Sequence, residues 1–391
     1  MSVRVTVVCS ARFHHFDLAR QLSKRDMLVR FFTGYPVWKL RGEDLPPEKV
    51  VTFPWLMTPY MALSRWGMMK EPLQRELAWA AKEALDSYVS RRLPECDVLF
   101  ALSGSGLKSF RTASRRGIRT VCDRGSSHIR YQEVILKEEF YRWGERFSGI
   151  DPRVIAKEEA EYEAADIITV PSEFARNSFV EMGVPSSKLK KAPYGVDLRR
   201  FEKTCDPAED GFDVLFVGQV SFQKGVPYLL KAFEGLRHPG KRLRIIGSMQ
   251  PEMKRYLNRH PPVGKVEVLG AMSQKELKYA MSCSHVMVLP SVQDGFGLVL
   301  AQAMVCGCPV IGTTNTGAAD LFTDGVEGFI VRPQDPDVIT ERLQLMADDP
   351  EQRNRMSENA LKRVTEIGGW DDYGARISDI LAEMMESHDD Q

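Results

Sequence analysis

The sequence predicts an α/β protein built from two doubly wound parallel sheets. Short apolar, β-branched runs alternate along the chain with longer segments of helical pattern, which is typical of parallel sheets with crossover helices. Several of these runs end in a glycine-containing turn that leads into a helix. The chain has 391 residues, too many for one ordinary domain, and fits two domains of about 190 residues each.

The stretch from Val286 to Ile311 is the most informative part of the chain. Val286 to Leu289 is a short apolar run that suits a buried strand. A glycine-rich turn, Asp294 to Gly297, follows it, and a helix is expected from about Leu298 to Val305. A turn of this kind leaves unpaired N–H groups and the positive end of the helix dipole at the sheet edge. We therefore expect a phosphate or another anion to bind there.

Two polar residues flank this helix start. Asp294 precedes Gln302 by eight positions in the sequence. One side chain lies before the helix and the other about one turn into it, so both can reach a ligand that lies over the helix start. Carboxylates and amides suit sugar hydroxyls because they accept hydrogen bonds and can bind in a bidentate way.

In its order of residues, this stretch resembles the sugar-nucleotide motif of retaining glycosyltransferases of the GT-B fold, glycosyltransferase family 4. The family pattern is Glu-Gly-Phe-Gly-Leu, then a second Glu in an Ala-Met-Ala-x-Gly-x-Pro-Val helix. The matching residues are Gly295, Phe296, Gly297, Leu298, Ala303, Met304, Gly307, Pro309 and Val310. The chain departs from the pattern at both acids, where it has Asp294 and Gln302.

A second segment of the chain resembles the same family. Residues 218–225 follow the strand Val214 to Val217 and match the family's Gly-x-x-x-x-x-Lys-Gly loop. The resemblance implies that Lys224 binds the donor diphosphate and gives positive charge to the leaving group. Relatives usually carry an arginine in this loop, whereas this chain has Gln219 and Gln223 at the candidate places.

The resemblance also implies roles for individual residues at the donor site. Asp294 would hold the sugar hydroxyls, Gln302 the ribose, and the backbone around Leu269 would flank the base. The implied donor-binding residues are Gly218, Gln219, Lys224, Gly247, Leu269, Asp294, Gly295, Phe296, Gly297, Leu298 and Gln302. The implied catalytic residues are His128, Lys224 and Asp294.

His128 follows the predicted strand Arg119 to Asp123. The carboxyl end of a strand is where ligands lie in such sheets, and histidine titrates near neutral pH. In similar glycosyltransferases, a histidine in this loop borders the donor sugar, so the resemblance implies that role for His128. The alternative is that His128 caps the following helix.

The acceptor is expected on the first half of the chain. Arg12 and His14 lie in the loop after the first predicted strand, Arg4 to Cys9, where related enzymes often have Gly-Gly. We expect these two residues to contact the acceptor, with a surface or packing role as an equal alternative.

Charge divides unevenly between the two halves of the chain. Residues 1–200 hold 33 Lys and Arg against 25 Asp and Glu, and residues 201–391 hold 20 against 28. The basic first half predicts an anionic or lipid-linked acceptor, or contact with an anionic membrane surface. In residues 36–80, aromatic residues and methionines alternate with basic residues, which suits an interfacial membrane segment or core-facing helices joined at prolines. We expect no nucleic-acid partner.

The cysteines and the hydropathy pattern give expectations about compartment. Seven cysteines are scattered without a CxxC motif, so we expect seven reduced thiols in a cytoplasmic protein. Cys306 and Cys308 lack further ligands at metal-binding spacing, and Asp335-Pro336-Asp337 is better explained as a helix cap. No apolar run is long enough for a transmembrane helix. We therefore expect no metal site.

The expected organisation is two Rossmann-like domains facing a cleft. Residues 1–203 would form the acceptor-binding domain, residues 204–368 the nucleotide-sugar domain, and residues 369–391 a helix that crosses back, with an acidic tail. The expected function is retaining, metal-independent transfer of a sugar from a nucleotide diphosphate sugar to a hydroxyl acceptor, without a further cofactor. The alternatives are a non-catalytic binding subunit, suggested by Gln219 and Gln302, and a sugar-nucleotide epimerase or a phosphorylase of the same fold.

Overall fold

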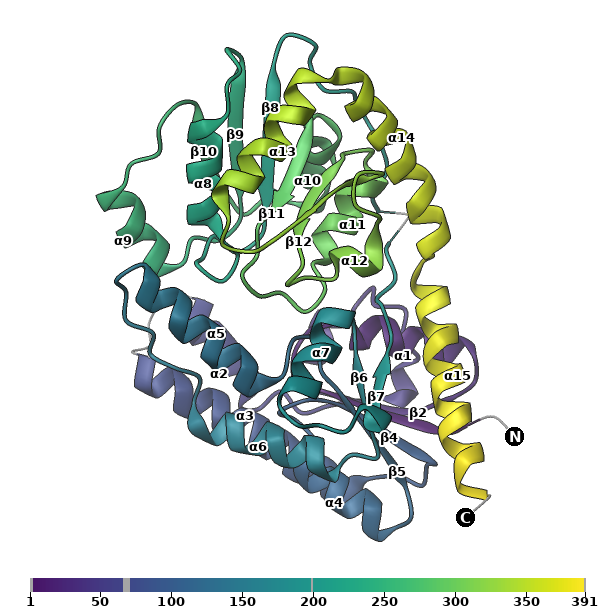
Figure 1. The fold of residues 1–391 in the computed structure, drawn as a ribbon. Coiled ribbons are helices and arrows are strands. Elements are labelled where there is room, and N and C mark those ends of the chain that lie inside the picture. Colours follow the sequence, from purple (N-terminus) through teal and green to yellow (C-terminus); the bar gives the residue numbers. More distant parts are fainter. Residues whose placement is uncertain (1–2, 66–70, 198–199, 390–391) are drawn as a thin grey trace.

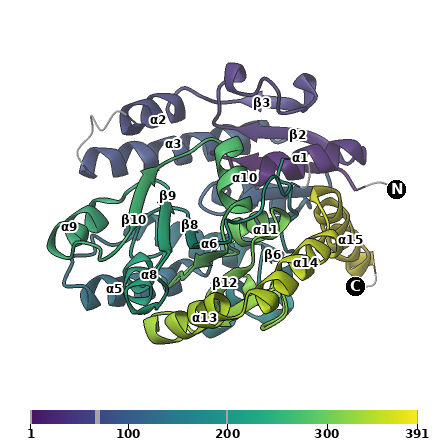
Figure 2. The same ribbon diagram turned by 90° about the horizontal axis from the view of Figure 1, so that it is seen from above.

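The computed structural model describes residues 3–65, 71–197 and 200–389. Two parallel sheets, each covered by helices, lie one above the other in Figure 1, and Figure 2 shows the same arrangement from above. This confirms the predicted α/β class with two doubly wound sheets.

The first sheet has seven strands, all paired in parallel. They are β1 (Val5–Cys9), β2 (Leu28–Thr33), β3 (Val50–Thr52), β4 (Val98–Leu102), β5 (Arg119–Asp123), β6 (Ile167–Val170) and β7 (Leu189–Lys191). Their spatial order is β3-β2-β1-β4-β5-β6-β7. The chain thus starts at β1, builds outward to one edge, and returns past β1 to build the other half. The loops after β1 and β5 therefore meet at the same sheet edge.

The second sheet has six strands, also parallel. They are β8 (Phe212–Val217), β9 (Lys241–Ile246), β10 (Val266–Gly270), β11 (Val286–Leu289), β12 (Val310–Thr313) and β13 (Gly328–Val331). Their order is β10-β9-β8-β11-β12-β13. Every residue of the adjacent strands β8 and β11 is buried, as their apolar runs predicted.

Helices connect the strands on both faces of each sheet. In the first half they are α1 (His15–Lys24), α2 (Met57–Arg65), α3 (Glu71–Arg92), α4 (Leu107–Arg115), α5 (Ile129–Arg142), α6 (Pro152–Ala164) and α7 (Glu173–Glu181), with 3-10 turns η1 (Val37–Lys39), η2 (Pro47–Lys49) and η3 (Ser186–Lys188). In the second half they are α8 (Val226–Gly235), α9 (Pro251–Arg259), α10 (Gln274–Ser282), α11 (Leu298–Val305), α12 (Ala318–Leu321), α13 (Pro336–Asp348), α14 (Pro350–Ile367) and α15 (Trp370–Asp389). Asp335 caps α13 by accepting a hydrogen bond from Val338 N, so the capping interpretation of this acid is confirmed.

The last helix, α15, lies against the first domain. Figure 1 shows α14 and α15 following one another down one side of the molecule, with α15 beside α1. Lys24 forms an ion pair of 3.2 Å with Asp371, and the Arg376 guanidinium donates to Pro193 O at 3.1 Å. The two domains are therefore connected a second time, after the crossing near residue 200.

A separate contact between the domains involves α5. Trp143, just past the end of this helix, packs against Phe222, Tyr228 and Tyr256 of the second domain. The buried Glu139 carboxylate accepts hydrogen bonds from Trp143 Nε1 and Tyr228 Oη. Burial raises the pKa of Glu139, and these donors only partly offset that effect.

The segment from 36 to 80, expected as an interfacial membrane segment or as core-facing helices joined at prolines, is only partly helical. It contains two 3-10 turns and the edge strand β3 before α2 begins. Val37, Trp38 and Trp55 are exposed by 66%, 61% and 75%. Four further members of the predicted pattern of aromatic residues, methionines and basic residues lie outside the described residues: Trp66, Met68, Met69 and Lys70. Among the residues that the structure does describe, no helix is long and apolar enough to pass through a bilayer.

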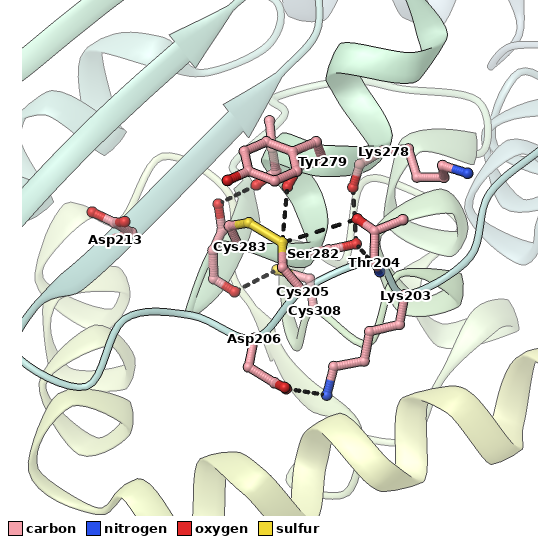
Figure 3. The surroundings of a disulfide bond; sticks show 12 residues. Lys203, Thr204, Cys205, Asp206, Asp213, Lys278, Tyr279, Ser282, Cys283 and Cys308 are labelled. Atoms are coloured by element: carbon pink, nitrogen blue, oxygen red, sulfur yellow. Dashed lines mark hydrogen bonds and ion pairs between the residues drawn. A yellow bond between two sulfur atoms is a disulfide. The ribbon is translucent and has the colours of Figure 1, made fainter.

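The expectation of seven reduced cysteines is wrong for two of them. Cys205 and Cys283 form a disulfide between the segment after the domain crossing and the end of α10 (Figure 3). The other five cysteines are buried free thiols. The two bonded residues are 78 positions apart, so their spacing in the sequence did not indicate a disulfide. The fold brings their Cα atoms to within 5.6 Å of each other. Thr204 N also donates to Ser282 Oγ at 3.1 Å, so this segment is held on the second domain.

Candidate active site

The carboxyl-terminal edge of the second sheet carries Lys224 and Asp294 on neighbouring loops. Lys224 follows β8 and Asp294 follows β11, and these two strands are adjacent. Lys224 Nζ donates to Asp294 Oδ2 in an ion pair, and each side chain is 19% exposed. The structure thus brings together two charged residues that the sequence assigned to the donor. Their opposite charges satisfy each other while both remain accessible.

Close backbone packing shapes the loops around this pair. Gly247 has φ +148°, and a Cβ there would lie 1.7 Å from Gly218 O. Gly297 has φ +74° and directly precedes α11. Only glycine fits such positions without strain. These glycines therefore fix where β8, β9 and α11 meet, which is the place predicted for the donor.

The start of α11 opens on a cavity that both domains line. This cavity has a volume of about 160 Å³. Leu298 and Gln302 of α11 line it from the second domain, and Arg12 and Phe13 line it from the first. Arg12 is half-exposed and forms an ion pair of 2.7 Å with Glu43. The structure therefore places the predicted ribose contact, Gln302, opposite the predicted acceptor contact, Arg12.

The remaining predicted donor residues fall into two groups. Gln219 and Leu269 are exposed at the ends of β8 and β10. Gly218 and Gly247 lie between them, and Gly247 N donates to Gly270 O at 2.7 Å. The Phe296 ring is instead buried and packs edge-on against Tyr194 at 5.3 Å. Its side chain supports the loop, so only its backbone remains to face a ligand.

Gln293 is a residue of this site that sequence reasoning missed. Its side chain is buried, and its amide donates to Ser126 Oγ at 2.7 Å and to Ser127 Oγ at 2.9 Å in the first domain. Gln223 Nε2 in turn donates to Gln293 Oε1 at 2.7 Å. The residue precedes Asp294 in the central motif, but nothing local identifies partners 166 and 167 positions away.

His128 lies in the loop between β5 and α5, as the sequence predicted, and it is the N-cap residue of α5. Its Nδ1 accepts a hydrogen bond from Arg130 N, so the residue caps α5. The ring lies 5.0 Å from both Tyr162 and Phe179, and only 4% of the residue is exposed. Burial lowers the pKa of His128 to about 4. The ring contacts that the structure shows lie within the first domain, and they fit the capping alternative.

His14, in contrast, lies at the edge of the first sheet beside Asp123. His14 Nε2 and Asp123 Oδ2 are hydrogen-bonded at 2.8 Å, and Thr169 Oγ1 donates to Asp123 Oδ1 at 2.6 Å. Burial raises the pKa of the Asp123 carboxyl, but His14, His15 and Thr169 outweigh it and leave the pKa below its ordinary value. Asp123 is therefore a buried carboxylate that stays ionised at neutral pH.

Among the described residues, His14, His15 and Asp123 form a group whose potential metal-ligand atoms lie within 4.8 Å of one another. His15 Nε2 is 3.4 Å from the same Asp123 oxygen that His14 contacts. Neither ring nitrogen of His15 has a hydrogen-bond partner in the described part of the chain, whereas a metal-binding imidazole normally donates its second N–H to an acceptor. We therefore interpret the group as a hydrogen-bonded His14–Asp123 pair with a neutral histidine beside it.

Comparison with protein families matches residues 200–363 to the model described as glycosyl transferases group 1. An uncharacterized glycosyltransferase of Methanocaldococcus jannaschii is 29% identical over 279 residues, or 66% of this chain and 70% of that protein. A D-inositol 3-phosphate glycosyltransferase of Streptomyces griseus is 29% identical over 202 residues, or 46% of this chain and 41% of that protein. The family model thus covers the domain that carries Lys224 and Asp294.

Solved structures resemble the chain over almost its whole length. Sucrose-phosphate synthase of Thermosynechococcus elongatus has a TM-score of 0.74 at 18% identity, covering 98% of this chain and 100% of that one. HepE of Anabaena, crystallised in complex with UDP and glucose, has a TM-score of 0.71 at 16% identity, covering 97% of this chain and 100% of that one. At these identities the likeness establishes the fold shared by both domains.

Proposed function

We propose that this chain, which has the GT-B fold, belongs to the glycosyl transferases of group 1. It moves a sugar from a nucleotide diphosphate sugar to a hydroxyl acceptor, with retention of configuration and without a metal. The observation that carries the proposal is the accessible Lys224–Asp294 pair beside the start of α11. It offers a cation, a carboxylate and the N-terminal end of a helix at one sheet edge. A sugar diphosphate needs these three kinds of partner.

Donor binding changes the partners of both charged residues. The diphosphate takes Asp294's place beside Lys224, because it carries more negative charge than one carboxylate and is held by the N–H groups of α11 as well. Asp294 is then free to accept hydrogen bonds from the sugar hydroxyls. As the bond between the sugar and the diphosphate breaks, Lys224 stabilises the charge that develops on the leaving group.

The expected lack of a metal requirement rests on this arrangement. In the proposal, Lys224 and the start of α11 supply the positive potential that a divalent cation would otherwise provide at a diphosphate. The chain has Gln219 and Gln223 where relatives usually have an arginine. Lys224 therefore supplies most of the positive charge at the diphosphate. Turnover that is unchanged in the presence of EDTA would support the proposal, and turnover that requires added Mg²⁺ or Mn²⁺ would contradict this part of it.

We propose an acceptor that carries negative charge. Arg12 lies in the cavity opposite Gln302, and the first 200 residues have more basic than acidic side chains. Relatives named D-inositol 3-phosphate glycosyltransferases suggest a phosphorylated polyol as one acceptor to test. D-inositol 3-phosphate should therefore be glycosylated faster than unphosphorylated inositol. Equal rates with the two polyols would argue against a charged acceptor.

Contact with an anionic membrane is proposed for the same half of the chain. The exposed Trp38 and Trp55 lie before α2, and Lys39 and Arg41 are near the first of them in sequence. Indole rings favour the headgroup region, and basic residues favour anionic lipid. Sedimentation with vesicles that contain anionic lipid should retain the wild type and release a Trp38→Ser, Trp55→Ser variant. If the wild type binds neither vesicles with anionic lipid nor vesicles without it, the proposal is refuted.

A binding subunit without activity is the second candidate. Gln302 in place of the family's Glu keeps hydrogen bonding and loses charge, which should weaken donor binding without abolishing it. The deciding experiment is a thermal-shift panel of UDP-, GDP- and ADP-linked sugars, read together with nucleotide release. Stabilisation by one donor with release of its nucleotide supports the enzyme. Stabilisation without release favours the binding subunit, and no stabilisation by any donor contradicts the donor site.

A further inference from the structure

The loop of residues 293–295 in the second domain, which we call the donor loop, is hydrogen-bonded to the first domain through Gln293. The amide nitrogen of Gln293 donates to Ser126 Oγ at 2.7 Å and to Ser127 Oγ at 2.9 Å, and the side chain is fully buried. A primary amide has two N–H donors, and these two bonds use both of them. The side chain of Gln293 therefore depends on the first domain for its acceptors.

The residue on the other side of Asp294 also contacts the first domain. Ser172 Oγ donates to the Gly295 carbonyl at 2.6 Å. A Cβ on Gly295 would lie 2.1 Å from Gly125 O, so the two backbones are in direct contact. Asp294 thus lies between two residues that the first domain holds, while its own side chain pairs with Lys224.

The same amide links the two loops that carry the charged pair. Gln223 Nε2 donates to Gln293 Oε1 at 2.7 Å, and Val292 N donates to Gln223 O at 2.9 Å. The two glutamines directly precede Lys224 and Asp294 in the sequence. The Gln293 side chain therefore contacts the first domain through its nitrogen and the loop that carries Lys224 through its oxygen.

Burial makes these hydrogen bonds costly to lose. A buried amide without partners is unfavourable, because nothing then compensates for the water it gave up on folding. Separation of the two domains would leave the nitrogen of Gln293 without its two serine acceptors. The donor loop is therefore expected to rearrange whenever this contact breaks.

We propose that Gln293 is a positioning residue that couples the contact between the two domains to the placement of Asp294. This inference rests on the glycosyl transfer proposed above. With both serine contacts in place, Gln293 holds the Asp294 carboxylate where it accepts hydrogen bonds from the donor sugar. Without them, the diphosphate still binds at Lys224 and the start of α11, but the sugar is not held in the orientation that transfer needs.

The test compares Gln293→Met, a Ser126→Ala, Ser127→Ala variant, and the combination of all three substitutions. Methionine is similar in length to glutamine and has no amide. The first two variants should release nucleotide about 10- to 100-fold more slowly than the wild type. Release is measured from the sugar nucleotide that stabilises the wild type best, with water and with D-inositol 3-phosphate as acceptor. The combined variant should be no slower than Gln293→Met, because all three substitutions remove the same contact.

Binding measurements separate a positioning role from a general loss of structure. In both variants, the affinity for the nucleoside diphosphate of that donor should stay close to the wild-type value, because Lys224 and the start of α11 hold it. The affinity for the sugar nucleotide should fall about tenfold, the effect of losing one hydrogen bond to the Asp294 carboxylate. Isothermal titration calorimetry measures both affinities. A purely structural role would lower the two affinities equally.

Gln344→Met is the matched control, because the Gln344 amide bonds only to Arg237 and Asp348 among the described residues, and it should keep the wild-type rate and affinities. Wild-type turnover and sugar-nucleotide affinity in Gln293→Met would overturn the inference. So would a serine variant that behaves as the wild type while Gln293→Met does not, since Gln293 would then act within the second domain alone. Failure of the wild type to bind or turn over any donor would instead contradict the proposed function, so the two failures are distinguishable.

Discussion

The two sheet edges that face each other in this molecule are assembled in different ways. The second-sheet edge takes Lys224 and Asp294 from two short, contiguous segments, residues 218–225 and 286–311, each recognisable by its own motif. The first-sheet edge collects His14, Asp123 and Thr169 from three strand ends, across separations of 109 and 46 positions. The proposed donor half of the site is thus local in sequence, whereas the opposite half exists only in the folded chain.

The strongest test of this comparison removes the positive charge of Lys224 at the second-sheet edge. Lys224→Ala should lower kcat by about 100- to 1,000-fold, or roughly 3 to 4 kcal/mol, because the leaving diphosphate loses its cation. The thermal midpoint without ligand should change little, since the side chain is partly exposed. Steady-state nucleotide release measures the effect, with Lys265→Ala as a control at an exposed lysine. If the Lys224→Ala variant kept wild-type turnover, the assignment of Lys224 to the site would be wrong.

The disulfide should stabilise the second domain. Reduction of Cys205–Cys283 opens a loop of 78 residues, and chain entropy sets the loss of unfolding free energy at about 4 kcal/mol. Denaturant titration with and without dithiothreitol measures this loss. The Cys205→Ser, Cys283→Ser double variant should respond to dithiothreitol by less than about 0.5 kcal/mol. If this variant matches the oxidised wild type in stability, the bond contributes nothing.

The close contact between Gly247 and Gly218 should contribute somewhat less to the unfolding free energy than the disulfide does. Gly247→Ala places a Cβ about where Gly218 O lies, so the ends of β8 and β9 must separate. We expect a loss of about 3 kcal/mol in unfolding free energy, measured by the shift of the denaturant midpoint. Gly211→Ala is the matched control, because its nearest neighbour atom is 3.5 Å away and its effect should be small. Equal losses of unfolding free energy in the two variants would mean that the backbone at Gly247 and Gly218 can move apart without a large cost.

The smallest expected effect concerns the buried histidine of the first-sheet edge. Burial lowers the pKa of His15 to about 3, so the folded protein keeps it neutral while the unfolded chain protonates it below about pH 6.5. The unfolded state therefore binds more protons, and stability falls as the pH drops from 6.5 toward 3. Between pH 7 and pH 5, the wild type should therefore lose about 2 kcal/mol more unfolding free energy than the His15→Phe variant does.

Unfolding free energies of the wild type and His15→Phe at pH 7 and pH 5 measure this difference. His128 and His285 also have pKa values lowered to about 4 by burial, so the variant should retain part of the acid sensitivity. An identical pH dependence in the wild type and His15→Phe would show that His15 can be protonated in the folded protein.

Much of the fold was predictable because the pattern of its elements is local. The strands Val286–Leu289 and Arg119–Asp123 and the helix Leu298–Val305 have the bounds that hydrophobic runs and glycine turns indicated. The edge strand β3 was not predicted, because Val50–Thr52 is only half-buried and too short for a clear pattern. The disulfide was missed for a different reason, since its cysteines come together only through packing of α10.

The sequence by itself determined the α/β class and the two motifs that carry Lys224, Asp294 and the start of α11. These features depend on neighbouring residues, because strand runs, glycine turns and helix starts are short-range properties. Only the tertiary structure decided that Lys224 pairs with Asp294, that His128 is a buried cap, and that His14 meets Asp123. The order of strands in a sheet decides which loops share an edge, and that order is set by packing of the whole chain.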